Sequence, residues 1–120
     1  MSAMTFQIKR VYDDAERADG ARVLVDRLWP RGIKKEALGL ELWCKDIAPS
    51  ADLRAWFDHR ADRFGEFTKR YTAELDENSA VDDLLELESQ KKTVTLLYGA
   101  KDRELNQAVV LKDYLESARK

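Results

Sequence analysis

Residues that could bind an anion follow two apolar segments of the sequence, one near each end of the chain. Arg27 and Arg31 come soon after the first segment. Lys101 and Asn106 come soon after the second. Arginine can hold an anion through two parallel hydrogen bonds, and lysine adds a movable positive charge. These residue types predict a site for phosphate, carboxylate or sulfate if the two segments meet in space.

Three residues are of types that could transfer a proton. Asp26 and Asp102 follow the two apolar segments, and His59 lies between them in the chain. Each also has a structural interpretation. A carboxylate at a strand end often binds the backbone of the turn, and a histidine at a helix end can interact with the helix carboxyl terminus. Asn106 could likewise bond to the start of a helix. The sequence leaves open whether the protein is an enzyme.

The two apolar segments are predicted to be buried strands. Val23–Val25 and Thr93–Tyr98 are rich in branched side chains, which is typical of strands covered on both faces. Several helices are predicted between them, so the two strands could lie parallel and adjacent after a long crossover. Their carboxyl ends would then open on the same edge, which is where α/β sheets bind ligands.

Two further strands are predicted, one before and one after the strand at Val23–Val25. Residues Thr5–Tyr12 alternate apolar and polar side chains, which indicates a strand near a sheet edge. Asp13–Gly20 shows no period and is interpreted as a loop. Leu40–Lys45 alternates well enough to predict another strand, with Leu40, Leu42 and Cys44 on one face.

Helices are predicted over most of the remaining chain. Ser50 is the expected N-cap of a helix that carries Trp56 and Phe57. The apolar spacing of residues 61–75 predicts the next helix. Ser79 resembles the start of a capping box for a third, and a last helix is expected from about Arg103 to Ala118. The sequence therefore predicts a single α/β domain over residues 1–120, with a mainly parallel central sheet of about four strands flanked by helices.

Composition limits the classes of function. The chain is 44% hydrophobic, which is too apolar for a disordered protein, and its formal net charge of -2 supplies no broad positive field. Nucleic acid is therefore an unlikely but not an excluded partner. We find no apolar run long enough to cross a membrane and no signal peptide, so we expect a cytoplasmic protein.

Covalent and metal chemistry have little support in the sequence. The chain has one histidine and one cysteine, Cys44, which argues against a zinc site. It lacks a glycine-rich phosphate loop and a Gly-x-Ser-x-Gly nucleophile motif. Cys44 lies in a predicted strand and is better interpreted as a small buried side chain than as a nucleophile. We predict neither a metal nor a cofactor.

Several ordered motifs carry a family resemblance. They are the segment 26–32 (Asp-Arg-Leu-Trp-Pro-Arg-Gly), the segment from Trp43 to Phe57, and the segment 96–108 with its Ala-Lys-Asp and Asn-x-Ala elements. Together they resemble the YeaO-like branch of a bacterial domain-of-unknown-function family over nearly the whole chain. The resemblance implies a compact α/β fold but no established activity. It also leads us to expect a histidine where this chain has Gln107 and a tryptophan where it has Arg63.

The predicted function is binding, with turnover left open, of a small anionic metabolite or nucleotide at the carboxyl ends of the central strands. Arg27 and Arg31 would hold the anion, and Lys101 would neutralise its charge. The role of orienting these groups, or of contacting a polar part of the ligand, falls to Asp26, Asp102 and Asn106. The alternative is a regulatory or scaffolding module that binds protein or nucleic acid through the same charged rim. Lys34 and Lys35 would extend that rim. The sequence does not predict an oligomeric state.

Overall fold

The computed structural model describes residues 4–119 and contains one four-stranded parallel sheet. The strand order is β1-β4-β2-β3, and every neighbouring pair is parallel. The strands are β1 (Thr5–Arg10), β2 (Ala21–Leu24), β3 (Leu42–Trp43) and β4 (Thr93–Tyr98). The predicted α/β class with a parallel sheet of about four strands is confirmed, and β1 is an edge strand as expected.

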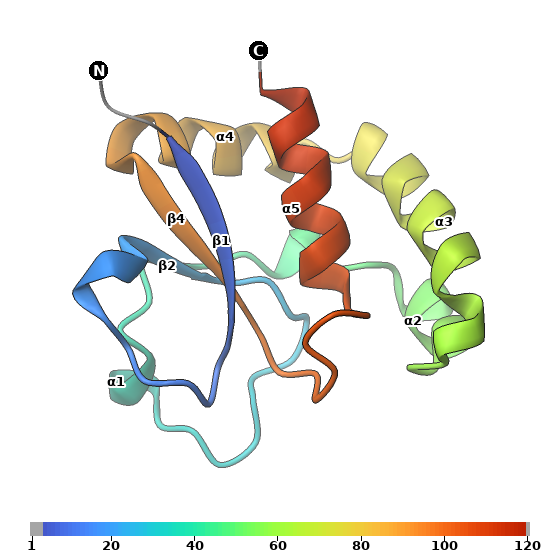
Figure 1. The fold of residues 1–120 in the computed structure, drawn as a ribbon, viewed down its shortest axis with the longest axis horizontal. Coiled ribbons are helices and arrows are strands. Elements are labelled where there is room, and N and C mark those ends of the chain that lie inside the picture. The colour runs from blue at the N-terminus through green and yellow to red at the C-terminus, as the bar shows by residue number, and fades with distance from the viewer. Residues whose placement is uncertain (1–3, 120) are drawn as a thin grey trace.

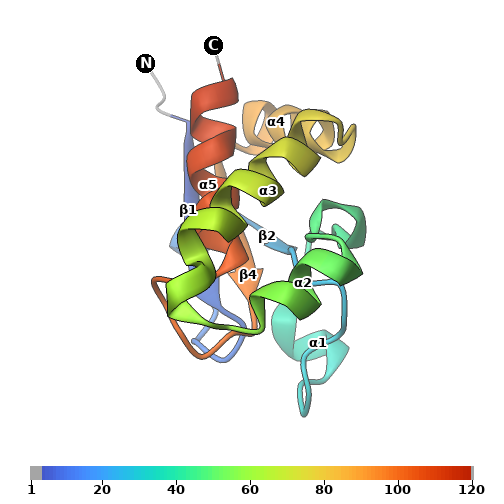
Figure 2. The same cartoon turned by 90° about the vertical axis from the view of Figure 1, so that its right-hand side faces the viewer.

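Helices and short 3-10 turns connect the strands. The α-helices are α1 (Lys35–Leu38), α2 (Ala51–Phe57), α3 (Phe64–Asp76), α4 (Ala80–Lys91) and α5 (Gln107–Ala118). The 3-10 turns are η1 (Arg17–Asp19), η2 (Lys45–Ile47) and η3 (Ala61–Arg63). Figure 1 shows α5 running alongside the strands, and Figure 2 shows α3 and α5 on the same side of the sheet.

The two central strands are buried because both of their faces are covered. All four residues of β2 and five of the six residues of β4 are buried. They pair directly, with Val23 opposite Leu96 and Leu24 opposite Leu97. The predicted long crossover is therefore confirmed, because α1 to α4 all lie between β2 and β4 in the chain. The carboxyl ends of these strands consequently open on one edge.

The sheet separates two apolar clusters. The larger one joins one face of the sheet to α2, α3, α4 and α5, and includes Val23, Leu96, Phe67 and Leu111. The smaller one lies on the opposite face, where Leu24 and Leu97 pack with Leu38 of α1. Strand side chains alternate between faces, so adjacent residues of β2 and β4 contribute to different clusters. The thick helical layer thus covers one face, and a loop with α1 covers part of the other.

Two helix starts matter for the site because they lie near the carboxyl edge of the sheet. The Ser50 hydroxyl accepts a hydrogen bond from the Leu53 N–H at 3.2 Å, so the predicted N-cap of α2 is confirmed. The Asn106 side chain accepts from the Ala108 and Val109 N–H groups and begins α5. Each cap satisfies backbone donors that the first helical turn leaves free.

The structure corrects four local predictions. The strand expected over Leu40–Lys45 shrinks to Leu42–Trp43, because the chain enters η2 at Lys45 and leaves the Leu42 side chain exposed. The last helix begins at Gln107 rather than near Arg103. Ser79 makes no capping bond, and the Asn78 side chain accepts from the Ala80 N–H instead.

The fourth correction concerns the polar stretch after β1. It contains the 3-10 turn η1, which is held by the buried carboxylate of Asp19. Lys9 and Arg22 both form ion pairs with this carboxylate. Removing one partner would leave a buried charge uncompensated, so these ion pairs hold the stretch in place although it lacks apolar periodicity.

None of the helices formed by residues 4–119 is long and apolar enough to span a bilayer. The predicted cytoplasmic location is not tested by the fold and stays a prediction.

Candidate functional site

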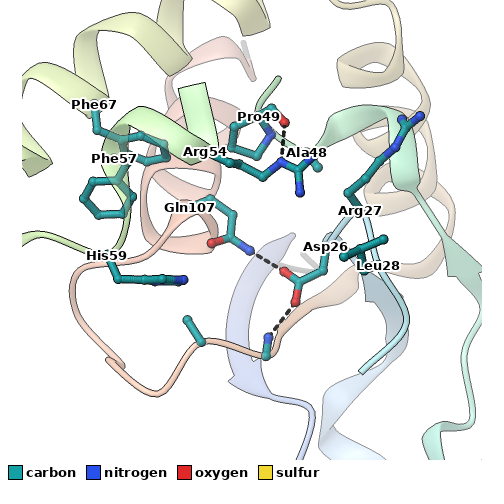
Figure 3. Close-up of a pocket in the computed structure, with 12 residues that line it drawn as sticks. Asp26, Arg27, Leu28, Ala48, Pro49, Arg54, Phe57, His59, Phe67 and Gln107 are labelled. Carbon is teal, nitrogen blue, oxygen red and sulfur yellow. Dashed lines mark hydrogen bonds between the residues drawn. The ribbon is translucent and has the colours of Figure 1, made fainter. Parts of the chain in front are cut away.

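A half-open pocket lies at the carboxyl edge of the sheet, beside the ends of β2 and β4 (Figure 3). Its volume is about 340 Å³. Pockets of at least roughly this size commonly bind small molecules in proteins. The lining comes from the turns after β2 and β4, from α2 with the residues just before and after it, and from one residue each of α3 and α5. Segments far apart in the sequence therefore meet here.

Asp26 projects into this pocket directly after β2. One carboxylate oxygen accepts a hydrogen bond from the Gly99 N–H at 2.8 Å, and the other accepts from the side-chain amide of Gln107. The carboxylate is only partly exposed, and burial raises its pKa above the ordinary value of 3.8. The two hydrogen bonds and the charges of Arg54 and His59 oppose this rise. Asp26 is thus held in a fixed position in surroundings that disfavour its charge.

Gly99 and Gln107 can hold Asp26 because one lies directly after β4 and the other begins α5. Gly99 follows the last residue of β4, and a Cβ at this position would lie 3.0 Å from an Asp26 oxygen. Gln107 is the first residue of α5 and is placed by the Asn106 cap. The two segments 26–32 and 99–106 therefore do meet, at Asp26 and Gly99.

Arg54 brings a positive charge to the pocket from α2. Its Nε donates a hydrogen bond to the Pro49 carbonyl oxygen at 3.1 Å, which fixes the plane of the guanidinium group. Within residues 4–119, its terminal nitrogens have no hydrogen-bond or ion-pair partner. Figure 3 shows the Arg54 side chain and the Asp26 carboxylate on facing sides of the pocket. Fixed donors without a protein partner are suited to binding an anion.

Arg27 contributes less directly. It lines the pocket but is exposed, and its guanidinium group lies 3.6 Å from the Asp46 carboxylate. Figure 3 shows this group pointing away from Asp26. Exposed pairs of this kind contribute little to stability, so the side chain is free to reorient at small cost. Arg27 is therefore a charge on the rim of the pocket.

His59 closes the opposite side of the pocket. Its backbone and that of Asp58 are left-handed, with φ values of 54° and 48°, which is rare for two successive residues other than glycine. This turn ends α2 and directs the imidazole towards the pocket, where it packs against Phe57 with ring centroids 6.1 Å apart. Among the described residues, no hydrogen bond joins His59 to Asp26. A histidine and carboxylate pair ready for acid-base catalysis is thus not formed.

The remaining walls are mainly apolar. Phe57 and Phe67 stack with their ring centroids 4.3 Å apart and form one side. Ala48 and Pro49 form another, and Leu28, whose side chain is 72% exposed, lies on the rim. The pocket therefore combines a few polar groups with apolar walls, as ligand sites usually do.

The structure brings only some of the predicted site residues to this pocket. Asp26, Arg27 and His59 line it, whereas Arg31 and Lys101 are exposed and do not. The Asp102 carboxylate accepts hydrogen bonds from the Glu104 and Leu105 N–H groups, so it is engaged in a turn.

Asn106 has a supporting position. It is 1% exposed, its side-chain oxygen caps α5, and its amide donates to the Asp102 carbonyl oxygen at 2.8 Å. These bonds place Gln107, which does reach the pocket. The contacts of Asn106 thus agree with its interpretation as a residue that hydrogen-bonds to the start of a helix.

Sequence reasoning did not select Arg54 or give Gln107 a site role. One available signal was the spacing of Arg54 and Phe57 near the end of a predicted helix, since positions three apart lie on one side of a helix. That signal does not show which residues Arg54 faces, because this depends on how α2 packs over the edge of the sheet. Over residues 4–119, no cluster of three or more His, Cys, Asp or Glu side chains could hold a metal ion.

The fold and pocket define a small α/β protein whose ligand site would lie at the carboxyl edge of a parallel sheet. The chain belongs to the family described as the inactive DUF488-N3 subclade, whose model matches residues 5–120. It is 47% identical to the uncharacterized protein YeaO of Escherichia coli (strain K12) over 114 residues, which covers 95% of this chain and 99% of that protein.

Mycobacterial proteins are also similar to the chain. The chain is 41% identical to the uncharacterized protein Rv3073c of Mycobacterium tuberculosis (strain ATCC 25618 / H37Rv) over 109 residues, which covers 91% of this chain and 92% of that protein. The uncharacterized protein Mb3100c of Mycobacterium bovis (strain ATCC BAA-935 / AF2122/97) matches to the same extent. No solved structure matches the chain. The expected YeaO-like family is confirmed.

Proposed function

We propose that this protein binds a small anionic metabolite in the pocket beside Asp26 and Arg54. The observation that carries the proposal is the Arg54 guanidinium group, which is fixed by the Pro49 carbonyl oxygen and offers its terminal nitrogens to the pocket. Arg27 on the rim and His59 on the opposite side add donors for the same anion. A site with two arginines at the carboxyl edge of a parallel sheet agrees with where α/β proteins bind ligands.

The size of the pocket favours a small metabolite over a nucleotide. A volume of about 340 Å³ is near the lower end of the range of roughly 300–1,000 Å³ over which small-molecule sites occur. A nucleotide has a base, a sugar and a phosphate, so only part of it would be enclosed.

Binding is a better proposal than turnover. The Asp26 carboxylate already accepts two hydrogen bonds, and its Gln107 partner is a neutral amide that does not exchange protons in normal catalysis. Cys44 is buried, and burial raises the pKa of its thiol to about 11, so it is a poor nucleophile. The description of the family as an inactive subclade agrees with this choice.

A thermal-unfolding screen tests the proposal. The panel contains phosphate, sulfate, small carboxylates, sugar phosphates, nucleotides, and short DNA and RNA, each over a range of concentrations. A ligand that binds only the folded state raises Tm with the logarithm of its concentration. We expect a small anion to raise Tm, and Arg54→Gln to weaken the apparent affinity by about tenfold or more.

Arg17→Gln is the matched control because it removes the same charge from an exposed side chain outside the pocket. It should respond to the anion as the wild type does. Equal weakening in both variants would indicate a general charge effect and contradict the proposal. A response to nucleic acid alone, lost steeply with added salt, would favour the charged-rim alternative instead.

A further inference from the structure

The pocket presents two opposite charges that do not bond to each other. The Asp26 carboxylate and the Arg54 guanidinium group face across it (Figure 3), and no hydrogen bond or ion pair joins them among residues 4–119. Arg54 nevertheless lies near enough for its charge to lower the pKa of Asp26. We propose that the ligand is itself a zwitterion, a small amino acid whose carboxylate binds Arg54 and whose ammonium group binds Asp26. This proposal rests on the proposed function of the same pocket.

Asp26 has the capacity to accept a further donor. Each oxygen of an ionised carboxylate has two acceptor positions, and Gly99 and Gln107 occupy one on each oxygen. The carboxylate lines the pocket, so the free positions are accessible to a ligand. An ammonium group supplies up to three N–H donors and a compensating charge. A partly buried carboxylate gains more from such a group than one in water does, because water screens it less.

Arg54 is complementary to the other end of the ligand. The bond from Nε to the Pro49 carbonyl oxygen leaves the terminal nitrogens to form parallel hydrogen bonds with a carboxylate. A simple anion would bind Arg54 but would leave the charge of Asp26 unpaired, so it should bind less tightly than a zwitterion. A simple amine would satisfy Asp26 but would be repelled by Arg54. Only a ligand with both charges matches both groups.

The walls of the pocket indicate which kind of amino-acid side chain the ligand would have. Phe57 and Phe67 form a stacked aromatic surface, and Pro49 adds an aliphatic one. The available volume of about 340 Å³ is large enough for an amino acid. The structure therefore favours an amino acid with an apolar side group, such as leucine.

The test compares molecules that share one skeleton. Leucine, isocaproate and isoamylamine have the same aliphatic group, but carry respectively both charges, the carboxylate alone and the amine alone. Apparent affinities come from Tm shifts and from calorimetric titration at neutral pH. Alanine, valine, methionine and phenylalanine, each with its deaminated acid, extend the comparison to other side groups. We expect at least one amino acid to bind about tenfold or more tightly than both single-charge analogues.

Three variants test which residue binds each charge of the ligand. Asp26→Asn has the same shape, and its side-chain oxygen can accept from Gly99 while its amide donates to Gln107 after rotation of the Gln107 amide. This variant should bind the deaminated acid as well as it binds the amino acid. Arg54→Gln should lose affinity for both. Arg54→Lys keeps the charge and should retain part of the binding, which separates charge from folding effects.

The outcomes distinguish the two proposals. If the deaminated acids bind wild type as tightly as the amino acids do, the zwitterion is wrong and the anion site stands. If neither amino acids nor any small anion binds, both proposals are wrong. An amino-acid preference that survives in Asp26→Asn would also overturn the assignment of the ammonium group to Asp26.

Discussion

The Gly99 N–H donates a 2.8 Å hydrogen bond to the Asp26 carboxylate and joins residues 73 positions apart in the chain. The bond connects the end of β4 to the end of β2, which are neighbouring strands. A Cβ on residue 99 would lie 3.0 Å from the Asp26 oxygen, closer than side chains normally approach. The absence of a side chain at Gly99 therefore allows the backbone to hold Asp26 at the pocket.

Asp26→Asn should change the pH dependence of folding. Burial raises the pKa of Asp26 above 3.8, so the folded protein holds this proton more tightly than the unfolded chain does. The resulting stability is present below the unfolded pKa and is lost as pH rises through the folded pKa. Relative to the wild type, Asp26→Asn should thus gain stability as pH rises from 3.8 through the raised pKa of Asp26 in the folded protein. Urea unfolding at a series of pH values measures the difference, and a constant difference would contradict this expectation.

Gly20→Ala should destabilise the protein severely. Gly20 has a φ of 62°, and an added Cβ would lie 2.3 Å from the Thr93 carbonyl oxygen in β4. Backbone strain and overpacking together should cost about 3 kcal/mol or more. Gly39→Ala is the control, since Gly39 has a φ of 55° but open space around it, and should cost about 1–2 kcal/mol. Equal losses of unfolding free energy in the two variants, measured with urea, would show that the contact between the added Cβ and Thr93 is unimportant.

Arg103 and Asp13 should stabilise the protein only above acidic pH. Their two hydrogen bonds, both 2.8 Å, connect the turns after β1 and β4. The Arg103 guanidinium lowers the pKa of Asp13 to about 2, so this stability is present above 3.8 and is lost as pH falls towards 2. Because 57% of the Arg103 side chain is exposed to screening by water, Arg103→Gln should lower the stability only slightly at neutral pH.

The matching experiment is urea unfolding of wild type and Arg103→Gln from neutral pH to about pH 2. The two stability curves should converge at the acidic end, since protonation of Asp13 removes the ion pair from the wild type as well. A stability difference that persists at the acidic end would mean that Arg103 acts mainly through packing.

Cys44 should react slowly with thiol reagents in the folded protein. Its side chain is buried, and burial raises the pKa of the thiol to about 11. Both effects suppress the reactive thiolate at about pH 8. Modification by iodoacetamide, followed by mass spectrometry, should be much faster in urea than in buffer. Rapid modification of the folded protein would mean that the thiol is accessible and would reopen its interpretation as a nucleophile.

The central part of the fold could be predicted because its signals are local. Three branched apolar residues at Val23–Val25 and the run Thr93–Tyr98 indicate buried strands, and the number of helices between them permits a parallel crossover. Ser50 indicated the start of α2 because an N-cap serine binds a backbone donor within its own first turn. The strand predicted over Leu40–Lys45 was longer than β3, because alternation of side chains does not show where pairing with a neighbouring strand ends.

The candidate site was predicted to lie on the correct edge of the sheet but with an incomplete set of residues. Asp26, Arg27 and His59 line the pocket, while Arg31 and Lys101 lie outside its lining. Charged residues in one turn can point in different directions, and the sequence does not give their orientation. Gln107 reaches Asp26 only because Asn106 caps α5 at that point.

By itself, the sequence determined the α/β class, the family and the edge at which charged turns gather, since these depend on apolar pattern and residue type along the chain. Only the tertiary structure decided that Arg54 faces Asp26 and that Gly99 and Gln107 hold the carboxylate between them. Those relationships join residues from four separate segments. They depend on how α2 and α5 pack over the ends of β2 and β4, and such packing is set by the whole core rather than by any local pattern.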